Sequence, residues 1–196
     1  MTRTGTLSRA TSETEISLSL DLDGAGRADV DTGIGFLDHM LTAFARHGLF
    51  DLTVRASGDL HIDAHHTTED VGIVLGQAFA KALGEKRGIR RFGQALVPMD
   101  EALVEAAVDI SGRAMLVWSV ALERPNLGDM DTELFEEFFR ALAGNALLTL
   151  HIVQRAGRNT HHIVEAAFKA AARALRVATE LDPRVGDAVP STKGSL

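Results

Sequence analysis

Two short segments of the chain place a pair of histidines ahead of a glutamate at the same spacing. The first is DAHHTTEDVG, residues 63–72, and the second is NTHHIVEAAF, residues 159–168. Residues four apart on a helix share one face, so each segment turns its first histidine and its glutamate to the same side. The second histidine of each pair points about 100° away. This arrangement suits two metal ions that share the donors of both segments.

Matching the two halves of the chain adds one further donor to each segment. His39, in GFLDHML, corresponds to Glu137, in FEEFF. Mixed imidazole and carboxylate donors in a chain without cysteine favour a six-coordinate ion such as Mn²⁺ over structural zinc. Two balanced sets of ligands result, namely His65, Glu69, His162 and Glu137, and His161, Glu165, His66 and His39.

The two histidine segments belong to a longer internal repeat. Residues 12–24 and 100–112 both alternate apolar and polar residues and end at glycine, which is typical of a strand followed by a turn. Residues 36–48 and 134–146 both have helical character, and each leads into a strand, a loop and a histidine segment. Long helices are then expected from Glu69 to about Gly84 and from Ile163 to about Glu180.

These patterns predict the α/β (α+β) class, with an internally duplicated half. Each half is expected to run strand, strand, helix, strand, strand, helix, with its helices packed on one face of a mixed or antiparallel sheet. We expect the halves, residues 1–90 and 91–196, to form one compact domain. The second half is longer, and the insertion is expected in the Pro/Gly-containing segment ERPNLGDMD, residues 123–131.

Composition limits the kinds of partner and location. The net charge of −7 argues against a nucleic-acid surface, which would normally be basic. No apolar run is long enough to span a bilayer, and the first 15 residues lack the apolar segment of a secretory signal. We therefore expect a cytoplasmic protein that acts on a small molecule, without nucleic-acid or membrane partners.

The segments GFLDHML, DAHHTTED, SGR, HHIVEAAFKA and PSTKG resemble, in order and spacing, the imidazoleglycerol-phosphate dehydratase family. The resemblance covers nearly the whole chain, from about Arg9 to Leu196. It implies a monofunctional hydro-lyase of histidine biosynthesis that converts imidazole glycerol phosphate to imidazole acetol phosphate and water. It also implies two Mn²⁺ ions per active site and a homo-oligomer of about 24 subunits, with the active sites at subunit interfaces.

The resemblance also assigns roles to single residues. The family's metal positions match the eight donors named above, except that the family commonly has histidine where this chain has Glu137. We keep Glu137 as a ligand, because a carboxylate also suits Mn²⁺. Glu13, in SETE, matches the family's acid–base glutamate, while Asp100 and Glu101 are site candidates without an assigned role. The phosphate contacts match residues that offer cationic or hydroxyl donors, which are Arg91, Arg113, Ser191 and Lys193.

The expected chemistry begins at a carbon whose proton is barely acidic, because no carbonyl is adjacent. A metal on the imidazole nitrogen would favour an imidazolate, which could expel the hydroxyl and give a diazafulvene-like intermediate. Glu13, close to two cations, is expected to be ionised, as a general base requires. Two alternatives remain open from the sequence: a non-enzymatic metal-binding shell, which needs no phosphate contacts, and a metal-dependent hydrolase, which would release phosphate.

Overall fold

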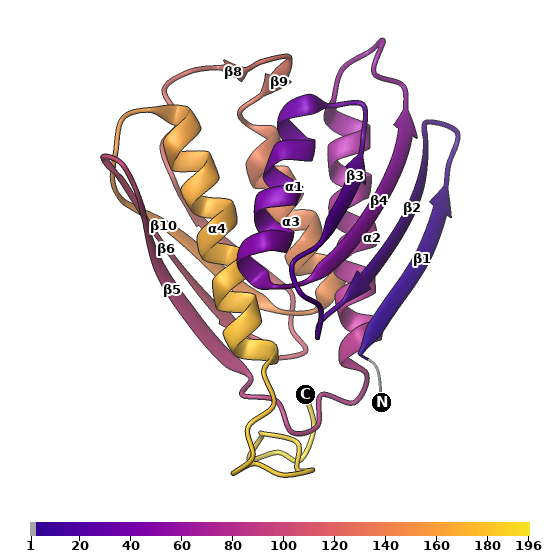
Figure 1. The fold of residues 1–196 in the computed structure, drawn as a ribbon, viewed down its shortest axis with the longest axis vertical. Helices are drawn as coiled ribbons and strands as arrows, with labels where there is room; N and C mark the ends of the chain where they lie inside the picture. The colour runs from indigo at the N-terminus through magenta and orange to yellow at the C-terminus, as the bar shows by residue number, and fades with distance from the viewer. Residues whose placement is uncertain (1–2) are drawn as a thin grey trace.

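The computed structural model describes residues 3–196, so the first two residues of the predicted first half lie outside it. The first half contains β1 (Thr4–Ala10), β2 (Thr14–Asp21), β3 (Ala28–Asp31), α1 (Gly35–Gly48), β4 (Asp51–Gly58) and α2 (His65–Leu83). The second half contains β5 (Phe92–Met99), β6 (Ala102–Asp109), β7 (Met115–Ser119), β8 (Asn126–Leu127), β9 (Met130–Asp131), α3 (Leu134–Ala146), β10 (Thr149–Ala156) and α4 (Thr160–Thr179). Figure 1 shows these elements in place.

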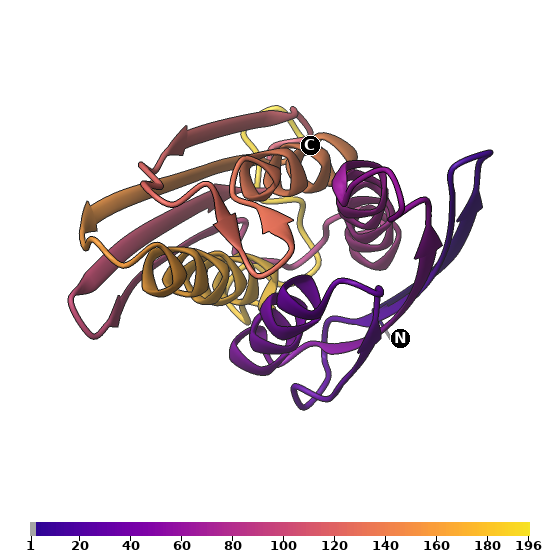
Figure 2. The same cartoon turned by 90° about the horizontal axis from the view of Figure 1, so that it is seen from above.

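The two halves build sheets with the same strand order. One sheet runs β1-β2-β4-β3 and the other β5-β6-β10-β7; in each, only the last pair is parallel. Residues at matching places in the two halves are called equivalent below. The four helices lie between the two sheets, so each sheet has one covered face and one outer face (Figure 2). The predicted fold class is therefore confirmed, with the helices on one face of each mixed sheet.

The predicted order of elements was wrong in one respect. Three strands, not two, precede the first helix of each half, and a single strand separates its helices. The strands that the prediction misplaced are β3 and β7, which are only four and five residues long. Each is a parallel edge strand and too short to show a clear alternation, so its place depends on pairing with β4 or β10 rather than on its own pattern.

Both long helices begin earlier than predicted, and this matters for the site. Helix α2 starts at His65 and α4 at Thr160, so each histidine pair lies in the first helical turn. Polar side chains just ahead of the helices explain the earlier start. The Asp63 carboxylate accepts a hydrogen bond from the His65 N–H at 2.7 Å, and the Asn159 side chain does the same for the N–H of His161.

The insertion in the second half is a small hairpin, β8–β9, as the Pro/Gly segment predicted. Strands β2 and β6 start 88 positions apart, at Thr14 and Ala102, whereas β4 and β10 start 98 apart, at Asp51 and Thr149. The hairpin accounts for the ten extra residues. The stretch from the start of β10 to His161 is then two residues shorter than the stretch from the start of β4 to His65, which gives the 96-residue spacing between His65 and His161.

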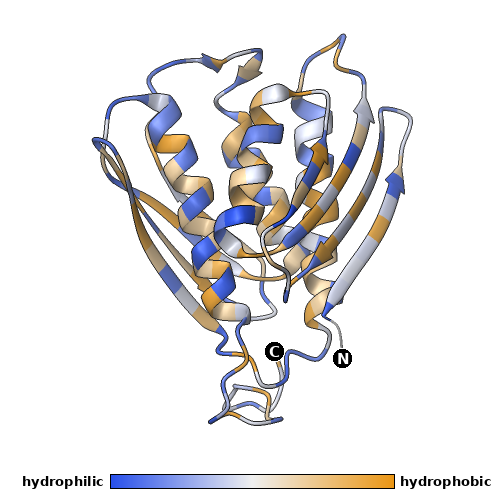
Figure 3. Ribbon diagram, viewed as in Figure 1, coloured by the Kyte–Doolittle hydropathy of each residue, from blue (hydrophilic) through white to orange (hydrophobic). Residues whose placement is uncertain are grey.

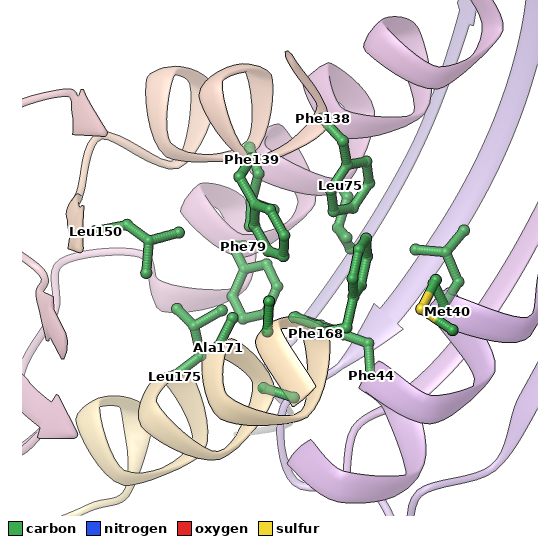
Figure 4. Packing of buried hydrophobic residues seen from close by; sticks show 14 of the residues in the cluster. Met40, Phe44, Leu75, Phe79, Phe138, Phe139, Leu150, Phe168, Ala171 and Leu175 are labelled. Atoms are coloured by element: carbon green, nitrogen blue, oxygen red, sulfur yellow. The ribbon is translucent and has the colours of Figure 1, made fainter. Parts of the chain in front are cut away.

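One apolar core joins the two halves. Phe44, Phe79, Phe138 and Phe168 come from the four different helices and are fully buried (Figure 4). The rings of Phe138 and Phe168 stack with centroids 5.2 Å apart. Helix α1 packs on α4 and α2 on α3, so each helix contacts the other half. No helix of residues 3–196 combines the length and apolarity needed to cross a membrane.

A pair of equivalent glycines lets each edge strand approach a helix closely. A Cβ added at Gly5, on β1, would lie 2.2 Å from the carbonyl oxygen of Ala78 on α2. A Cβ added at Gly93, on β5, would lie 2.0 Å from the carbonyl oxygen of Ala174 on α4. Any side chain at either glycine would push the strand off its helix. The halves therefore share not only strand order but the same close backbone contact.

The outer faces of the two sheets differ in character although the strands alternate in polarity in both (Figure 3). Residues with large exposed apolar side chains occupy the second sheet's outer face, and the equivalent positions of the first sheet are polar. The equivalent pairs are Phe92 and Thr4, Leu96 and Ser8, Met115 and Arg27, and Val117 and Asp29. These apolar side chains lie on the two edge strands β5 and β7, with Glu105 and His151 on the strands between them. Exposed apolar side chains gathered on one face are typical of an interaction surface.

Candidate metal centre and active site

Three of the predicted metal ligands meet at the helix ends near the β8–β9 hairpin. His39 is on α1, and His161 and Glu165 are on α4. The Glu165 Oε2 atom lies 3.3 Å from His39 Nε2 and 3.2 Å from His161 Nε2. Within residues 3–196, this trio is the one group of three such donors whose ligand atoms all lie within 4.8 Å of one another. It combines one residue of the first half with two of the second.

Local hydrogen bonds hold the two helix starts that carry the trio. The side-chain oxygen of Asn159 accepts hydrogen bonds from the backbone N–H groups of His161 and His162, at 3.0 and 3.4 Å. The N–H and hydroxyl groups of Thr32 donate to the Asp38 carboxylate at 2.9 and 2.6 Å, next to His39. The ring of Phe36 meets the His161 ring edge-on, with centroids 5.2 Å apart. The donors are therefore placed by rigid elements.

Lys169 is part of this site, although the sequence analysis did not identify it. Its Nζ atom lies 2.6 Å from Glu165 Oε1, one turn further along α4. Burial by itself raises the pKa of Glu165, but the hydrogen bond and charge of Lys169, together with His39, outweigh burial and hold that pKa below its usual range. The carboxylate is thus kept ionised, as a metal ligand must be. The i, i+4 spacing in EAAFK could have pointed to Lys169.

The equivalent trio of the other half is less closely gathered within one chain. His65 Nε2 lies 3.8 Å from Glu69 Oε2. Glu137, the equivalent of His39, has its Oε2 atom 3.4 Å from Arg140 Nε on its own helix. The structure therefore places His65 beside Glu69, with Glu137 on the neighbouring helix α3. The single chain does not bring all four residues of either predicted set together.

The second histidine of each pair faces a carboxylate rather than the trio. His66 Nδ1 lies 2.9 Å from Asp59 Oδ2, and His162 Nδ1 lies 2.7 Å from Glu101 Oε2. These hydrogen bonds raise the pKa of both histidines above the usual value and lower that of Glu101 to about 2. Glu13, the predicted acid–base residue, has its Oε2 atom 3.9 Å from His66 Nδ1, beyond hydrogen-bonding distance. Asp59 was missed because only the fold brings it to His66.

The four predicted phosphate contacts lie together at the opposite end of the helix layer. Arg91 donates to the Asp109 carboxylate at 2.7 Å and to the Pro190 carbonyl at 2.9 Å, which holds the C-terminal segment against β6. Ser191 follows Pro190, and its hydroxyl accepts a hydrogen bond from the Lys193 N–H at 3.2 Å. Gly112, next to Arg113, contacts Leu196: an added Cβ would lie 2.6 Å from its carbonyl carbon.

Helix α4 separates the two groups of predicted residues. His161 is in its first turn, while the Arg91 N–H donates to the Ala178 carbonyl oxygen in its last turn, at 2.9 Å. At 1.5 Å per residue, these two points on the helix are about 25 Å apart. Figure 1 shows α4 running from the hairpin end of the molecule to the C-terminal segment at the other end. A small metabolite cannot touch both groups within one chain.

The chemistry of the donors fits a divalent transition metal. The trio offers two imidazole nitrogens and one carboxylate oxygen, a mixture that suits Mn, Fe or Zn and leaves coordination positions for other ligands. A hollow of about 350 Å³ adjoins it. Both polar and apolar residues line this hollow, including Phe36, Met99, Arg124, His161 and His162. A metal held here would be open to a small polar ligand.

Comparison with known proteins gives one consistent result. The family model for imidazoleglycerol-phosphate dehydratase matches residues 32–175. The chain is 70% identical to the imidazoleglycerol-phosphate dehydratase of Granulibacter bethesdensis over 196 residues, all of both proteins. It is 68% identical to that of Gluconacetobacter diazotrophicus, covering 99% of this chain and 98% of the relative.

Solved structures of the same kind of protein share the fold. The crystal structure of imidazoleglycerol-phosphate dehydratase from Staphylococcus aureus has a TM-score of 0.83 and 42% identity, covering 91% of this chain and 99% of its own. The enzyme from Pyrococcus furiosus, crystallised in complex with (S)-C348, also has a TM-score of 0.83. It is 40% identical and covers 97% of this chain and 100% of its own.

Proposed function

This chain belongs to the imidazoleglycerol-phosphate dehydratase family and is therefore a dehydratase of the hydro-lyase class, and we propose that it converts imidazole glycerol phosphate to imidazole acetol phosphate and water. The observation that carries the proposal is the trio of His39, His161 and Glu165, contributed by both halves of the chain. An imidazole substrate suits such a centre, because ring nitrogens are good ligands for the same metals.

We propose Mn²⁺ as the metal, with two ions per active site. The trio would hold one ion, and the equivalent residues His65, Glu69 and Glu137 would contribute to the other, with His66 and His162 completing the two sets. When bound, the metal acts as a Lewis acid that polarises the substrate's imidazole ring and orients it. The ionised Glu165 would supply one donor, and the Nε2 atoms of His66 and His162 would supply others, because their Nδ1 atoms already face carboxylates.

Glu13 is proposed as the base that takes the proton from the substrate carbon. Its side chain is 52% exposed, and it lies beside His66 without a hydrogen bond to that ring. The carboxylate is therefore free to accept a proton from a bound molecule. Exchange for glutamine keeps the shape and removes the base, so Glu13→Gln should bind metal and substrate but lose turnover.

The phosphate group is proposed to bind Arg91, Arg113, Ser191 and Lys193 from a second copy of the chain. The separation of about 25 Å along α4 supports this, because a small substrate that touches the metal ligands of one chain must find its phosphate contacts elsewhere. The apolar outer face of the second sheet supports association of copies. We propose a homo-oligomer of about 24 subunits with its active sites between subunits.

Mixed particles test this arrangement directly. Glu13→Gln and Arg113→Ala should each be nearly inactive alone at low substrate concentration. Suppose that each site takes Glu13 from one chain and Arg113 from a neighbouring chain. In co-expressed particles each of these residues is intact in half of the copies, so both are intact in roughly a quarter of the sites, and activity returns there. Particles of either single variant, mixed after purification without exchange of subunits, are the control. No recovery would show that each site uses residues of one chain.

Two other functions make different predictions. A metal storage or scaffold shell would need no phosphate contacts, so Arg113→Ala would leave it intact, whereas in a dehydratase the variant raises KM for the substrate. A hydrolase of phosphorylated compounds would release inorganic phosphate, whereas a dehydratase keeps the phosphate ester. A phosphate-release assay therefore separates the hydrolase from the proposed enzyme.

We further propose that residues 1–90 and 91–196 are duplicated halves of a single compact domain. The same strand order and the equivalent Gly5 and Gly93 contacts support the duplication, and the shared core supports a single domain. A cytoplasmic location is proposed with the biosynthetic role. Each half depends on the other for its covered helix face, so neither half should fold alone.

A further inference from the structure

We propose that Asp59 and Glu101 are positioning residues that hold the second histidine of each pair by its Nδ1 atom, so that Nε2 faces the metal. The inference rests on the proposed metal-dependent function. It also assigns different tasks to the equivalent glutamates Glu13 and Glu101, of which only Glu13 is left free to move a proton.

In the second half, both carboxylate oxygens of Glu101 accept hydrogen bonds. Oε2 accepts a hydrogen bond from His162 Nδ1 at 2.7 Å. Oε1 accepts from the N–H groups of Arg158 and Asn159, at 3.2 and 2.8 Å, in the loop that leads into α4. The carboxylate therefore joins the histidine ring to the loop that precedes its helix, and both of its oxygens already accept hydrogen bonds from the chain.

In the first half, Asp59 accepts the corresponding hydrogen bond from His66, but it comes from a different position in the chain. Asp59 directly follows β4, and its side chain is 12% exposed. Oδ2 lies 2.9 Å from His66 Nδ1, while the buried Oδ1 makes no hydrogen bond to any residue in the described range 3–196. A half-buried carboxylate whose one side-chain partner among the described residues is a histidine ring is well placed to fix that ring's orientation.

The sheet register explains why the two halves use different residues. A register shift in β10 after Gln154 adds one residue, so the position equivalent to Asp59 is Arg158, 99 residues later. An arginine side chain has no acceptor for a hydrogen bond from a histidine ring. The second half therefore takes its carboxylate from Glu101, which is equivalent to Glu13.

The consequence in the first half concerns Glu13. Because Asp59 already accepts the hydrogen bond at His66 Nδ1, Glu13 makes none there: its Oε2 atom lies 3.9 Å from that nitrogen. Two glutamates at equivalent positions thus have different freedom. This difference gives a structural reason for one general base per chain rather than two.

A carboxylate on Nδ1–H selects the tautomer with a free Nε2 lone pair, orients the ring and makes the nitrogen a stronger donor. Removing such a partner commonly weakens metal binding by about 10- to 100-fold. The test compares Asp59→Ala and Glu101→Gln with Glu13→Gln and with Glu85→Gln, an exposed loop glutamate paired with Arg87. Mn²⁺ dissociation constants are measured on chelator-treated full-length protein by electron paramagnetic resonance of free Mn²⁺.

We expect Asp59→Ala and Glu101→Gln to weaken Mn²⁺ binding by about 10- to 100-fold, and their turnover to recover when Mn²⁺ is raised to saturation. Glu13→Gln should keep the dissociation constant and stay inactive at any Mn²⁺ concentration, and Glu85→Gln should match the unsubstituted protein. Melting temperatures of the metal-free variants are compared to separate weaker binding from a general loss of folding.

Three results would overturn the proposal. Unchanged Mn²⁺ affinity in both positioning variants would do so while leaving the proposed function intact. Glu101→Gln that binds Mn²⁺ normally but stays inactive would make Glu101 a second catalytic residue. The third result would be an unsubstituted protein that turns over substrate without binding Mn²⁺. The reaction would then need no metal, and Asp59 and Glu101 would have no metal toward which to orient the histidines.

Discussion

His39 and Glu165 lie 3.3 Å apart although 126 positions separate them in the chain. The contact exists because α1 of the first half packs on α4 of the second. Helix α3, which carries Glu137, packs in the same way on α2, which carries His65 and Glu69. The trio of His39, His161 and Glu165 is therefore built across the two halves, and its geometry depends on how the halves pack.

The role of Glu137 as a metal ligand can be tested by comparing its variants with a variant of the neighbouring Glu136. Glu137→Ala should weaken binding of one of the two Mn²⁺ ions by about tenfold or more, because a donor is lost. Glu137→His should keep the site, since imidazole also suits Mn²⁺. Glu136→Ala is the matched control, because Glu136 pairs with the same Arg140. Calorimetric titration of metal-free protein measures the change. Equal binding by all three variants would exclude Glu137 from the site.

The close approach of α2 to α3 depends on Gly76. An added Cβ would lie 2.6 Å from the Leu142 carbonyl oxygen, which is backbone and cannot move alone. Gly76→Ala should therefore lower the free energy of unfolding by about 1–3 kcal/mol. Gly144→Ala, on α3, meets nothing within 4 Å and should raise it by up to about 1 kcal/mol, because alanine favours helix. Urea unfolding of the metal-free protein compares them. A stabilised Gly76→Ala would contradict the packing described here.

Asp51 should make stability depend on pH. The Arg27 guanidinium and the N–H groups of Arg27 and Ala25 hold the pKa of Asp51 well below its usual range. Since the folded pKa is the lower one, the ionised carboxylate stabilises the fold above the unfolded pKa, and this stabilisation is lost as the pH falls through the folded value.

The substitution Asp51→Asn should accordingly cost about 1–3 kcal/mol at pH 7 and progressively less below pH 4. Urea unfolding at several pH values follows the difference from the unsubstituted protein. Asp29→Asn, which removes the more exposed partner of Arg55, should cost less at pH 7. If the difference in the free energy of unfolding between Asp51→Asn and the unsubstituted protein stayed constant down to low pH, the charge of Asp51 would not be the cause of the stabilisation.

The apolar outer face of the second sheet should contribute to assembly. Leu96→Ser combined with Met115→Ser should shift the particle toward smaller species in sedimentation velocity, since it removes apolar surface from the expected contact. Ser8→Ala, at the position equivalent to Leu96, is the control and should leave the size unchanged. Intact particles in the double variant would move the contact to another face.

The sequence predicted the parts of the fold that have a strong local pattern. Strands β2 and β6, helices α1 and α3 and the turn insertion lie where alternation, helical spacing and Pro/Gly residues placed them. The short strands β3 and β7 were misplaced because parallel edge strands are fixed by their neighbours. Among site residues, Lys169 had a readable spacing, whereas Asp59 is brought to His66 only by the folded chain.

The most direct measurement is an assay of metal-stripped protein with and without added Mn²⁺. Purified protein is treated with a chelator, Mn²⁺ is restored, and conversion of imidazole glycerol phosphate to the enolisable ketone product is followed together with phosphate release. We expect ketone product only with Mn²⁺, and no free phosphate. Full Mn²⁺ occupancy of the protein without any ketone product would contradict the proposed dehydratase function.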